Sequence, residues 1–298
     1  RGLGDVYKRQ NIDSLLNDAY QLPFKHISKA ESIPEKIFIN NANIMPGVLI
    51  NAEKGPVIID KNTDIHGQTY IEGPAYIGPG TIISALTKIK NSAIGNNCKI
   101  FPGSVISGEP QDLKFENGDT LTFIGNNTII RECVTINRGT IESGKTVIGN
   151  KSYLMASTHV AHDCIIGESV IMSNLATLGG HVEVDDKVII SGGVLVHQFC
   201  KIGSFSFIGG GYRVVQDVPP FIMAAGEPLK YSGINSIGLR RNGFSINTRK
   251  VIKEAYRLLF REKLSREKAL VEIKNTLPIN TEIKKIISFI ENSNRGLI

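Results

Sequence analysis

Residues 157–164, STHVAHDC, place His159, His162 and Asp163 close together in a segment that is otherwise small and aliphatic. A neutral imidazole is the side chain best suited to accept a proton near neutral pH, and a neighbouring carboxylate can fix its tautomer and stabilise its charged form. General base catalysis is therefore a chemistry that this stretch could perform. Whether it does so depends on where each side chain points, and hence on the elements that carry it.

An aliphatic residue or methionine recurs at every sixth position through much of the chain. From Ile124 to Val214, fifteen of the sixteen positions at this spacing follow the rule, and only Glu142 departs from it. The same step runs from Ile59 to Ile89. A period of six fits neither a helix nor a simple alternating strand, and it is typical of a parallel β-helix built from hexapeptide repeats. Three hexads would close one triangular coil, and the coils would stack at strand spacing.

We therefore predict a mainly β protein, with a left-handed parallel β-helix followed by a C-terminal α-helical domain. The predicted units are an N-terminal extension at 1–37, the β-helix at 38–223 and the helices at 224–298. Residues 1–10, RGLGDVYKRQ, lack an apolar pattern and are interpreted as an artefact. The polar stretches EPQDLKFENGDT and GTIESGKT interrupt the repeat and are predicted to be loops.

The repeat predicts which side chains point outward. Thr158, Val160 and Cys164 fall on interior positions, and Cys164 is interpreted as a packing residue. Stacking by one coil, or 18 residues, then gathers four of the six histidines on one outer ridge. The residues predicted for this ridge are His159, His162, Asp163, Gly180, His181, His197, Gln198 and Phe199.

The ridge suits one class of reaction. Gly180 lies one coil from His162, where its backbone N–H could stabilise an oxyanion. A base and an oxyanion donor on adjacent coils fit acyl transfer to a hydroxyl group. One difficulty remains, because neighbouring residues on a strand point to opposite faces. His162 and Asp163 can meet only if the chain turns a corner between them.

Composition and cysteine spacing argue against several classes of protein. No run of 18 or more apolar residues indicates a transmembrane helix. The four cysteines form no CxxC pair, which argues against a zinc ribbon or a disulfide framework and favours a reducing cytoplasm. The net charge is +6, and the segment from Arg240 onward carries 14 Lys+Arg against 6 Asp+Glu. This basic end indicates either an acidic partner or a solvated helical surface, and no pattern points to nucleic acid.

Several motifs identify a resemblance. They are QDLKF (111–115), IRECVTINRGT (130–140), THVAHDC (158–164), ATLGGHV (176–182), VHQFC (196–200), QDVPPF (216–221), GINSIGLRRNGFS (233–245) and the terminal SNRGLI. From about Phe101 onward the chain resembles the UDP-N-acetylglucosamine 3-O-acyltransferases that begin lipid A synthesis. The resemblance implies transfer of an (R)-3-hydroxyacyl chain from acyl carrier protein to the 3-hydroxyl of the sugar.

The resemblance also implies residue roles. His162 matches the general base, Asp163 its partner and Gly180 the backbone oxyanion donor. The residues that match substrate-contacting positions are Asp112, Lys114, His159, His181, His197, Gln198, Gly210, Asn235 and Arg241. Among these, Gly210 matches the position that sets acyl-chain length. The implied assembly is a cytoplasmic homotrimer without a metal or a cofactor of its own, since the acyl chain arrives on the phosphopantetheine of acyl carrier protein.

Three alternatives remain open. Residues 34–100 look more like the β-helix of a sugar-1-phosphate nucleotidyltransferase, so the chain could be a folded but inactive chimaera joined near GNNCKI. A related N-acyltransferase of the same pathway usually has a separate N-terminal uridine-binding domain, for which this chain has little room. A trimeric β-helix carbonic anhydrase would hold a metal through a His-x4-His pair, a spacing that this ridge lacks.

Overall fold

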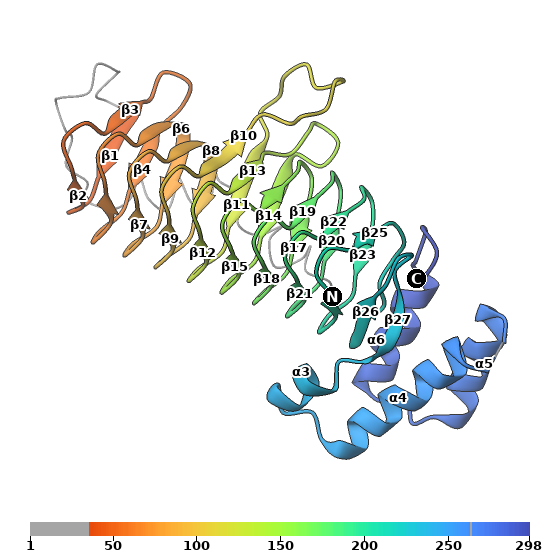
Figure 1. Ribbon diagram of the computed structural model, residues 1–298. Coiled ribbons are helices and arrows are strands. Elements are labelled where there is room, and N and C mark those ends of the chain that lie inside the picture. The colour runs from red at the N-terminus through yellow and green to blue at the C-terminus, as the bar shows by residue number, and fades with distance from the viewer. Residues whose placement is uncertain (1–35, 263) are drawn as a thin grey trace.

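The computed structural model describes residues 36–262 and 264–298. From β1 (Ile37–Ile39) to β26 (Ile222–Ala225) the chain winds into a parallel β-solenoid, and α-helices close its C-terminal end (Figure 1). The predicted parallel β-helix with a helical C-terminus is thus confirmed. Of the predicted extension at 1–37, residues 1–35, including the segment 1–10, lie outside the described residues.

Each coil crosses three faces of a prism. Face 1 contains β1, β4 (Val57–Ile59), β11 (Leu121–Ile124), β14 (Lys145–Ile148), β17 (Ile165–Ile166), β20 (Glu183–Val184) and β23 (Lys201–Ile202). Face 2 contains β3 (Leu49–Asn51), β10 (Val105–Gly108), β13 (Thr135–Asn137), β16 (His159–Val160), β19 (Thr177–Leu178), β22 (Leu195–Val196) and β25 (Arg213–Val214). The long strands β6 (Tyr70–Ile77) and β8 (Lys88–Ile94) cross from face 2 to face 1, each pairing with strands of both faces.

Face 3 lies opposite the edge that joins the other two faces. It contains β2 (Asn43–Ile44), β5 (Asp64–Ile65), β7 (Ile82–Ile83), β9 (Lys99–Ile100), β12 (Ile129–Ile130), β15 (Tyr153–Leu154), β18 (Ile171–Met172), β21 (Ile189–Ile190), β24 (Phe207–Ile208), β26 and β27 (Lys230–Ile234). All of these strands pair in parallel except β27, which runs antiparallel to β26.

The repeated aliphatic residues fill the interior of the prism. Ile148 pairs with Ile166, and Ile166 pairs with Val184, so residues 18 positions apart lie one above the other. These side chains are buried, as are their counterparts on the other two faces. Because a coil buries its aliphatic side chains mainly against the coils above and below it, the stack acts as one continuous core.

The edge between face 1 and face 3 is held by a ladder of side-chain caps, and we call it the ladder edge. The Asn96 N–H donates to Asn126 Oδ1 at 2.7 Å, and the Asn126 N–H donates to Asn150 Oδ1 at 2.8 Å. Further along, the Glu168 N–H donates to Asp186 Oδ1 at 2.8 Å. At these three positions an outward backbone N–H is thus capped by a side chain of the next coil, whereas the Asn150 N–H in the same column has no such cap among the described residues.

The edge between face 2 and face 1 carries the insertions, and we call it the site edge. Three segments, 52–56, 109–120 and 138–144, connect a face 2 strand to a face 1 strand and project from the stack on the same side (Figure 1). The two predicted loops therefore form and leave the prism at one edge. After the loops, β11 and β14 pair in an unbroken register, whereas β10 and β13, which precede the loops, pair with one register shift between Ile106 and Gly108.

The coils are continuous through residue 100. Ile83 pairs with Ile100, and Ile100 pairs with Ile130, without a bulge in either register. The solenoid before and after GNNCKI is therefore a single stack. The hypothesis of a chimaeric junction gains no support from the backbone at this position.

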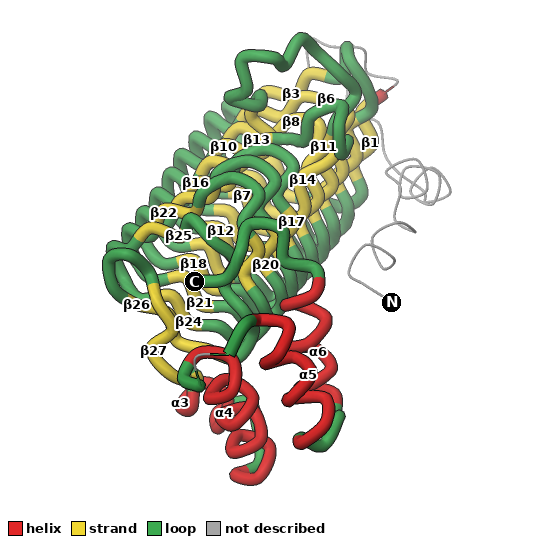
Figure 2. The backbone as a smooth tube through the Cα atoms, turned by 90° about the vertical axis from the view of Figure 1, so that its right-hand side faces the viewer, coloured by secondary structure: helices red, strands yellow, loops and turns green. Residues whose placement is uncertain are grey.

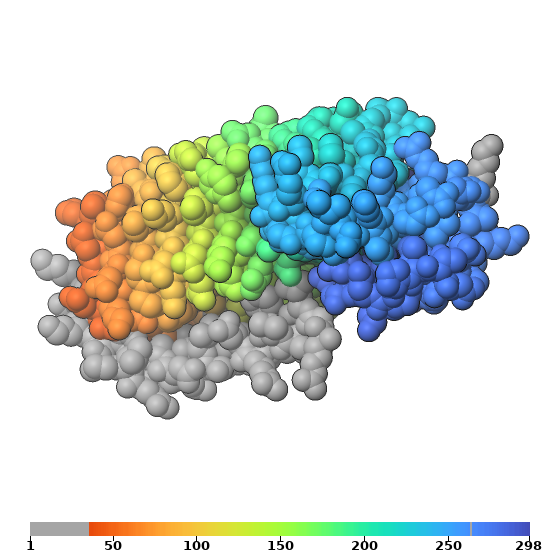
Figure 3. Space-filling model, turned by 90° about the horizontal axis from the view of Figure 1, so that it is seen from below, coloured from red at the N-terminus to blue at the C-terminus, as the bar shows by residue number. Residues whose placement is uncertain are grey.

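Four helices follow the solenoid and gather at its end (Figures 2 and 3). They are α3 (Ser236–Arg241), α4 (Ile246–Phe260), α5 (Arg266–Thr276) and α6 (Thr281–Glu291). Ser265 and Asn280 cap the N-termini of α5 and α6. The short helix α3 was not predicted. None of the helices within the described ranges is long and apolar enough to cross a membrane.

If the stacked aliphatic residues stabilise the fold, substituting a buried isoleucine should lower the free energy of unfolding more than substituting an exposed one. Ile190 is fully buried inside the solenoid, whereas Ile246 is exposed at the start of α4. Ile190→Ala should lower the free energy of unfolding by about 2–5 kcal/mol, because it leaves a cavity between stacked coils. Ile246→Ala should change it by less than about 0.5 kcal/mol. Urea unfolding followed by circular dichroism measures both, and equal losses would contradict this account of the core.

Candidate active site

His162 and Asp163 occupy a corner of the solenoid at the site edge, between β16 and β17. Asp163 has φ of +61°, and the corresponding corner residues of the next two coils, His181 and Phe199, have φ of +58° and +64°. This left-handed backbone turns the chain by one face. The turn resolves the difficulty raised by the sequence, because His162 and Asp163 both point outward and their side chains meet.

Asp163 is outward-pointing but buried, because the 138–144 loop folds over it. Its carboxylate accepts hydrogen bonds from the Thr140 N–H and the Thr140 hydroxyl, both at 2.8 Å, and from the Ser143 hydroxyl. Burial alone would raise the pKa of Asp163, but the hydrogen bonds from Ser143, His162 and Thr140 outweigh it and hold this pKa below the ordinary value. The carboxylate is therefore ionised at neutral pH.

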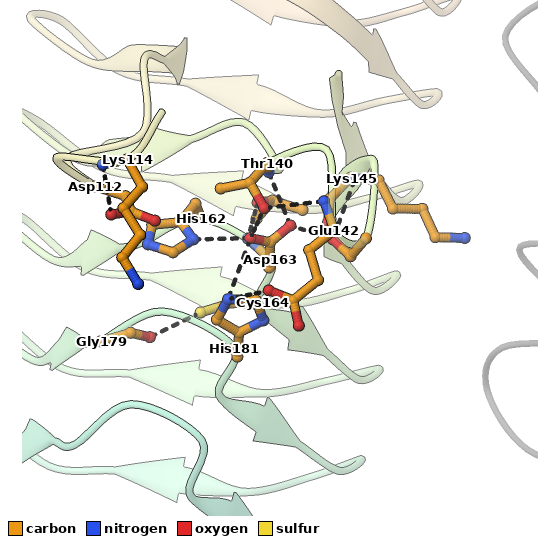
Figure 4. A network of polar contacts seen from close by, with 12 residues as sticks. Asp112, Lys114, Thr140, Glu142, Lys145, His162, Asp163, Cys164, Gly179 and His181 are labelled. Carbon is orange, nitrogen blue, oxygen red and sulfur yellow. Dashed lines mark hydrogen bonds and ion pairs between the residues drawn. The ribbon is translucent and has the colours of Figure 1, made fainter. Parts of the chain in front are cut away.

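His162 is oriented by this carboxylate. Its Nδ1 lies 2.8 Å from Asp163 Oδ2, and its side chain is only 13% exposed. An Nδ1–H that donates to a carboxylate leaves the Nε2 lone pair free to accept a proton. Figure 4 shows His162 and His181 approaching the Asp163 carboxylate from two sides, with Thr140 on another.

Gly180 lies directly against the imidazole of His162. A Cβ atom added to Gly180 would lie 2.6 Å from Cε1 and 2.8 Å from Nε2 of His162, closer than real Cβ atoms come. The Gly180 backbone does not require the left-handed region. The absence of a side chain therefore serves the close approach of the ring to the backbone.

The Gly180 N–H donates to no partner within the part of the chain that the structure describes. Gly180 occupies the same position within its corner as Asn126 and Glu168 occupy within corners of the ladder edge. Each of the three comes one residue before a corner residue with left-handed backbone. In Asn126 and Glu168 the N–H points outward and is capped by the next coil. At the site edge this cap is missing. The N–H of Gly180, the residue that packs against the His162 imidazole, therefore has no hydrogen-bond partner among the described residues.

The ring of His181 completes the cluster. It packs edge-on against His162 with centroids 5.2 Å apart and stacks on Phe199 at 4.6 Å. Its Nε2 lies 3.5 Å from Asp163 Oδ2 and 3.7 Å from Glu142 Oε2. His181 is thus held between the buried carboxylate and the loop that covers it.

His159 belongs to the same ridge. Its Nδ1 makes a 2.7 Å hydrogen bond with Thr135 Oγ1, one coil before it. Burial and the neighbouring His162 lower the pKa of His159, which favours its neutral form. His159 is therefore suited to hydrogen bonding with a substrate rather than to carrying charge.

One set of groups could hold a metal ion. Ligand atoms of His162, Asp163 and His181 lie within 4.8 Å of one another. However, His162 Nδ1 and Asp163 Oδ2 are already bonded to each other at 2.8 Å. A metal bound through these two atoms would have to break that contact.

The other predicted residues are spread more widely. His197 and Gln198 are exposed one coil beyond Gly180, where His197 Nδ1 bonds the Gln198 carbonyl at 3.0 Å. Asp112 and Lys114 lie on the 109–120 loop, and Asp112 accepts from the Lys114 N–H at 3.0 Å. Gly210 stands at the edge between faces 3 and 2, where a Cβ would meet the Gly192 carbonyl at 3.3 Å.

Asn235 and Arg241 lie at the two ends of α3. The Asn235 amide caps this helix through Gly238 N and also donates to the Phe205 carbonyl at 2.9 Å. Its side chain is therefore committed to structure. Arg241, in contrast, is exposed in the last turn of the helix.

The groups that support the cluster were not predicted from the repeat. Thr140 and Ser143 hold Asp163, and Thr135 holds His159. Thr140 ends the motif IRECVTINRGT, and the repeat breaks at GTIESGKT, which contains both Thr140 and Ser143. A break predicts a loop, but it does not predict that the loop folds back onto the ridge.

The chain is similar to known acyltransferases. Residues 217–298 match the family model described as Udp N-acetylglucosamine O-acyltransferase, domain 2. An acyl-(acyl-carrier-protein)–UDP-N-acetylglucosamine O-acyltransferase from Thermodesulfovibrio yellowstonii is 47% identical over 241 residues, which cover 80% of this chain and 93% of the relative. A protein of the same name from Burkholderia lata is 40% identical over 210 residues, covering 69% and 80%.

Two solved structures are also similar. A UDP-N-acetylglucosamine acyltransferase from Bacteroides fragilis matches with a TM-score of 0.72 and 42% identity, covering 86% of this chain and 98% of that one. The Arabidopsis enzyme of that name matches with a TM-score of 0.82 and 33% identity, covering 92% and 99%.

These matches also extend upstream of Phe101. The 241 residues aligned with the Thermodesulfovibrio relative exceed the length of the segment 101–298, so the alignment reaches into the first coils. A relative that is 47% identical and matched over 93% of its length shows that the chain belongs to the family of acyl-(acyl-carrier-protein)–UDP-N-acetylglucosamine O-acyltransferases.

Proposed function

We propose that this protein transfers an (R)-3-hydroxyacyl chain from acyl carrier protein to the 3-hydroxyl of UDP-N-acetylglucosamine, the first step of lipid A synthesis. The names of its relatives supply the donor and the acceptor. The observation that carries the proposal is the placement of a carboxylate-oriented imidazole directly against Gly180, a residue whose backbone N–H is uncapped. These are the base and the oxyanion donor that transfer to a hydroxyl needs.

This geometry supports a direct transfer between the two substrates. His162 Nε2 accepts the proton of the sugar hydroxyl as its oxygen bonds to the thioester carbon. The carbonyl oxygen becomes an oxyanion, which the Gly180 N–H stabilises. Collapse of the intermediate breaks the carbon–sulfur bond, and the imidazolium returns its proton to the leaving sulfur. The products are an ester of the sugar and a free thiol on the carrier protein.

Asp163 supports the base without accepting the proton itself. It fixes the Nδ1–H tautomer of His162 and stabilises the imidazolium electrostatically. Its own ionisation is secured by Ser143 and Thr140. Cys164 lies next in sequence, but it is buried inside the prism, which favours direct attack by the substrate over an acyl-enzyme.

The remaining residues are proposed to bind the substrates. His159, His181, His197 and Gln198 would line the ridge, and Asp112 and Lys114 would reach it from the 109–120 loop. Arg241 offers an exposed guanidinium that could bind phosphate. Asn235 would act indirectly, by capping the start of α3, the helix that carries Arg241. Gly210 would leave room for a long acyl chain.

The partners are also proposals. Lys250, Lys253 and Arg261 line a cavity of about 560 Å³ beside α4, which suits an acidic carrier protein. Exposed Leu175, Leu195 and Phe199 flank the histidines and favour contact with further copies in a homotrimer.

We propose that the enzyme uses no metal or cofactor of its own, since the carrier's phosphopantetheine holds the acyl chain. Its four free cysteines favour the cytoplasm.

Loss of the base should abolish transfer without unfolding the protein. We expect His162→Ala to lower kcat by about 10²–10⁴-fold, because no other group replaces Nε2. The matched control is His66→Ala, which removes a histidine near the opposite end of the solenoid. Turnover is measured with 3-hydroxyacyl carrier proteins of several chain lengths and UDP-N-acetylglucosamine, with and without a chelator, and light scattering gives the mass.

Wild-type turnover by His162→Ala would remove this residue as the base. Turnover only with a 3-amino analogue of the sugar would change the product from an ester to an amide. If the wild type is a folded trimer without turnover, the chain is better explained as a folded but inactive chimaera. Loss of turnover on addition of the chelator would favour a metal at His162, Asp163 and His181.

The low pKa of Asp163 predicts a pH-dependent contribution to stability. Because its pKa is depressed in the folded state, Asp163 stabilises the fold above the unfolded value of about 3.9, and this stabilisation is lost as pH falls. The free energy of unfolding should therefore differ most between wild type and Asp163→Asn above about pH 5. The difference should shrink toward pH 3 in urea titrations. A difference that widens on acidification would show that Asp163 is not held in its ionised form.

A further inference from the structure

The proposed oxyanion donor belongs to an unusually free piece of backbone. Gly179 and Gly180 are consecutive glycines, and glycine restricts the backbone less than any other residue. The Gly179 carbonyl and the Gly180 N–H are parts of one planar peptide unit, in which they point in opposite directions. Whatever fixes the carbonyl therefore fixes the direction of the N–H.

Cys164 fixes this carbonyl from inside the prism. Its Sγ donates to the Gly179 carbonyl oxygen at 3.1 Å, and its side chain is fully buried. No other described residue donates a hydrogen bond to that oxygen. A carbonyl that is held inward turns the Gly180 N–H outward, to the outer side of the prism on which His162 lies.

The Cys164 thiol must be protonated to donate this hydrogen bond. Burial raises the pKa of Cys164 to about 12, so the group stays protonated at neutral pH and can donate. A thiol is a weaker donor than a hydroxyl, and its bond is correspondingly weak. On this flexible dipeptide even a weak bond selects one orientation of the peptide unit.

Other coils use the same arrangement with hydroxyl groups. Thr128 and Ser152 occupy equivalent interior positions, and each donates to a glycine carbonyl of the next coil at 3.0 Å. Cys98 donates to the Gly125 carbonyl at 3.2 Å. In that coil, however, the following N–H, that of Asn126, is capped by Asn150. The Cys164 contact differs from these in that it holds the peptide of Gly180, the residue that packs against His162 and whose N–H has no partner among the described residues.

We propose that Cys164 is a positioning residue that holds the Gly179–Gly180 peptide with its N–H directed at the developing oxyanion. The inference rests on the proposed function, in which this N–H is the oxyanion donor. It adds a reason why a thiol occupies this interior position beyond the packing that the sequence predicted.

The test compares four variants. Cys164→Ala and Cys164→Val remove the donor, the first leaving space and the second filling it. Cys164→Ser should restore the bond, as Ser152 shows that serine fits an equivalent position. Cys98→Ala is the matched control, because it deletes the same kind of bond at a peptide that is capped.

We expect kcat to fall about tenfold in Cys164→Ala and Cys164→Val, with the KM for the sugar nucleotide changed less than about twofold. Complete loss of an oxyanion donor costs about 10²–10³-fold, and a misdirected donor should cost a part of this. Cys164→Ser and Cys98→Ala should keep kcat within about twofold of wild type. Equal losses in Cys164→Ala and Cys98→Ala, or no rescue by serine, would overturn the proposal.

A second measurement separates this inference from the proposed function. Crystal structures of wild type, Cys164→Ala and Cys164→Ser report the orientation of the Gly179–Gly180 peptide without any assay. A peptide that rotates in the alanine variant and not in the serine variant supports the positioning role even if wild type shows no turnover. An unchanged peptide in Cys164→Ala would refute it.

Discussion

The register between stacked coils is the constraint on which the rest of the structure depends. Val160 pairs with Leu178 through β16 and β19, and Leu178 pairs with Val196 through β19 and β22. The corners that follow these strands therefore lie one above the other. His162 and Gly180 meet because they are 18 residues apart in a stack that repeats every 18 residues. A single inserted residue between them would move the glycine to another position on the prism.

The loops respect the same register. Ile106 pairs with Ile136, 30 positions later, and Ile124 pairs with Ile148, 24 positions later. Both separations are whole multiples of six, so the interior pattern resumes in phase after each loop. Additions at the site edge can therefore cover the ridge without disturbing the core. This is how Thr140 and Ser143 come to hold a carboxylate that would otherwise face solvent.

Much of this could be predicted from the sequence. The six-residue period placed Thr158, Val160 and Cys164 inside and brought His162, Gly180 and His181 to one ridge, because the period determines direction and stacking together. What the period could not predict is what the loops contact. The burial of Asp163 and the committed side chain of Asn235 depend on contacts between segments that share no repeat.

The central claim is that the missing side chain at position 180 lets a backbone N–H and an imidazole act on one carbonyl group. The most direct test is the kcat of Gly180→Ala. Its Cβ would lie 2.8 Å from His162 Nε2, although the backbone there tolerates alanine. The account predicts a folded protein whose kcat is lower by about 10²-fold or more, as the ring and the oxyanion site are displaced together. Turnover at the wild-type rate would contradict it.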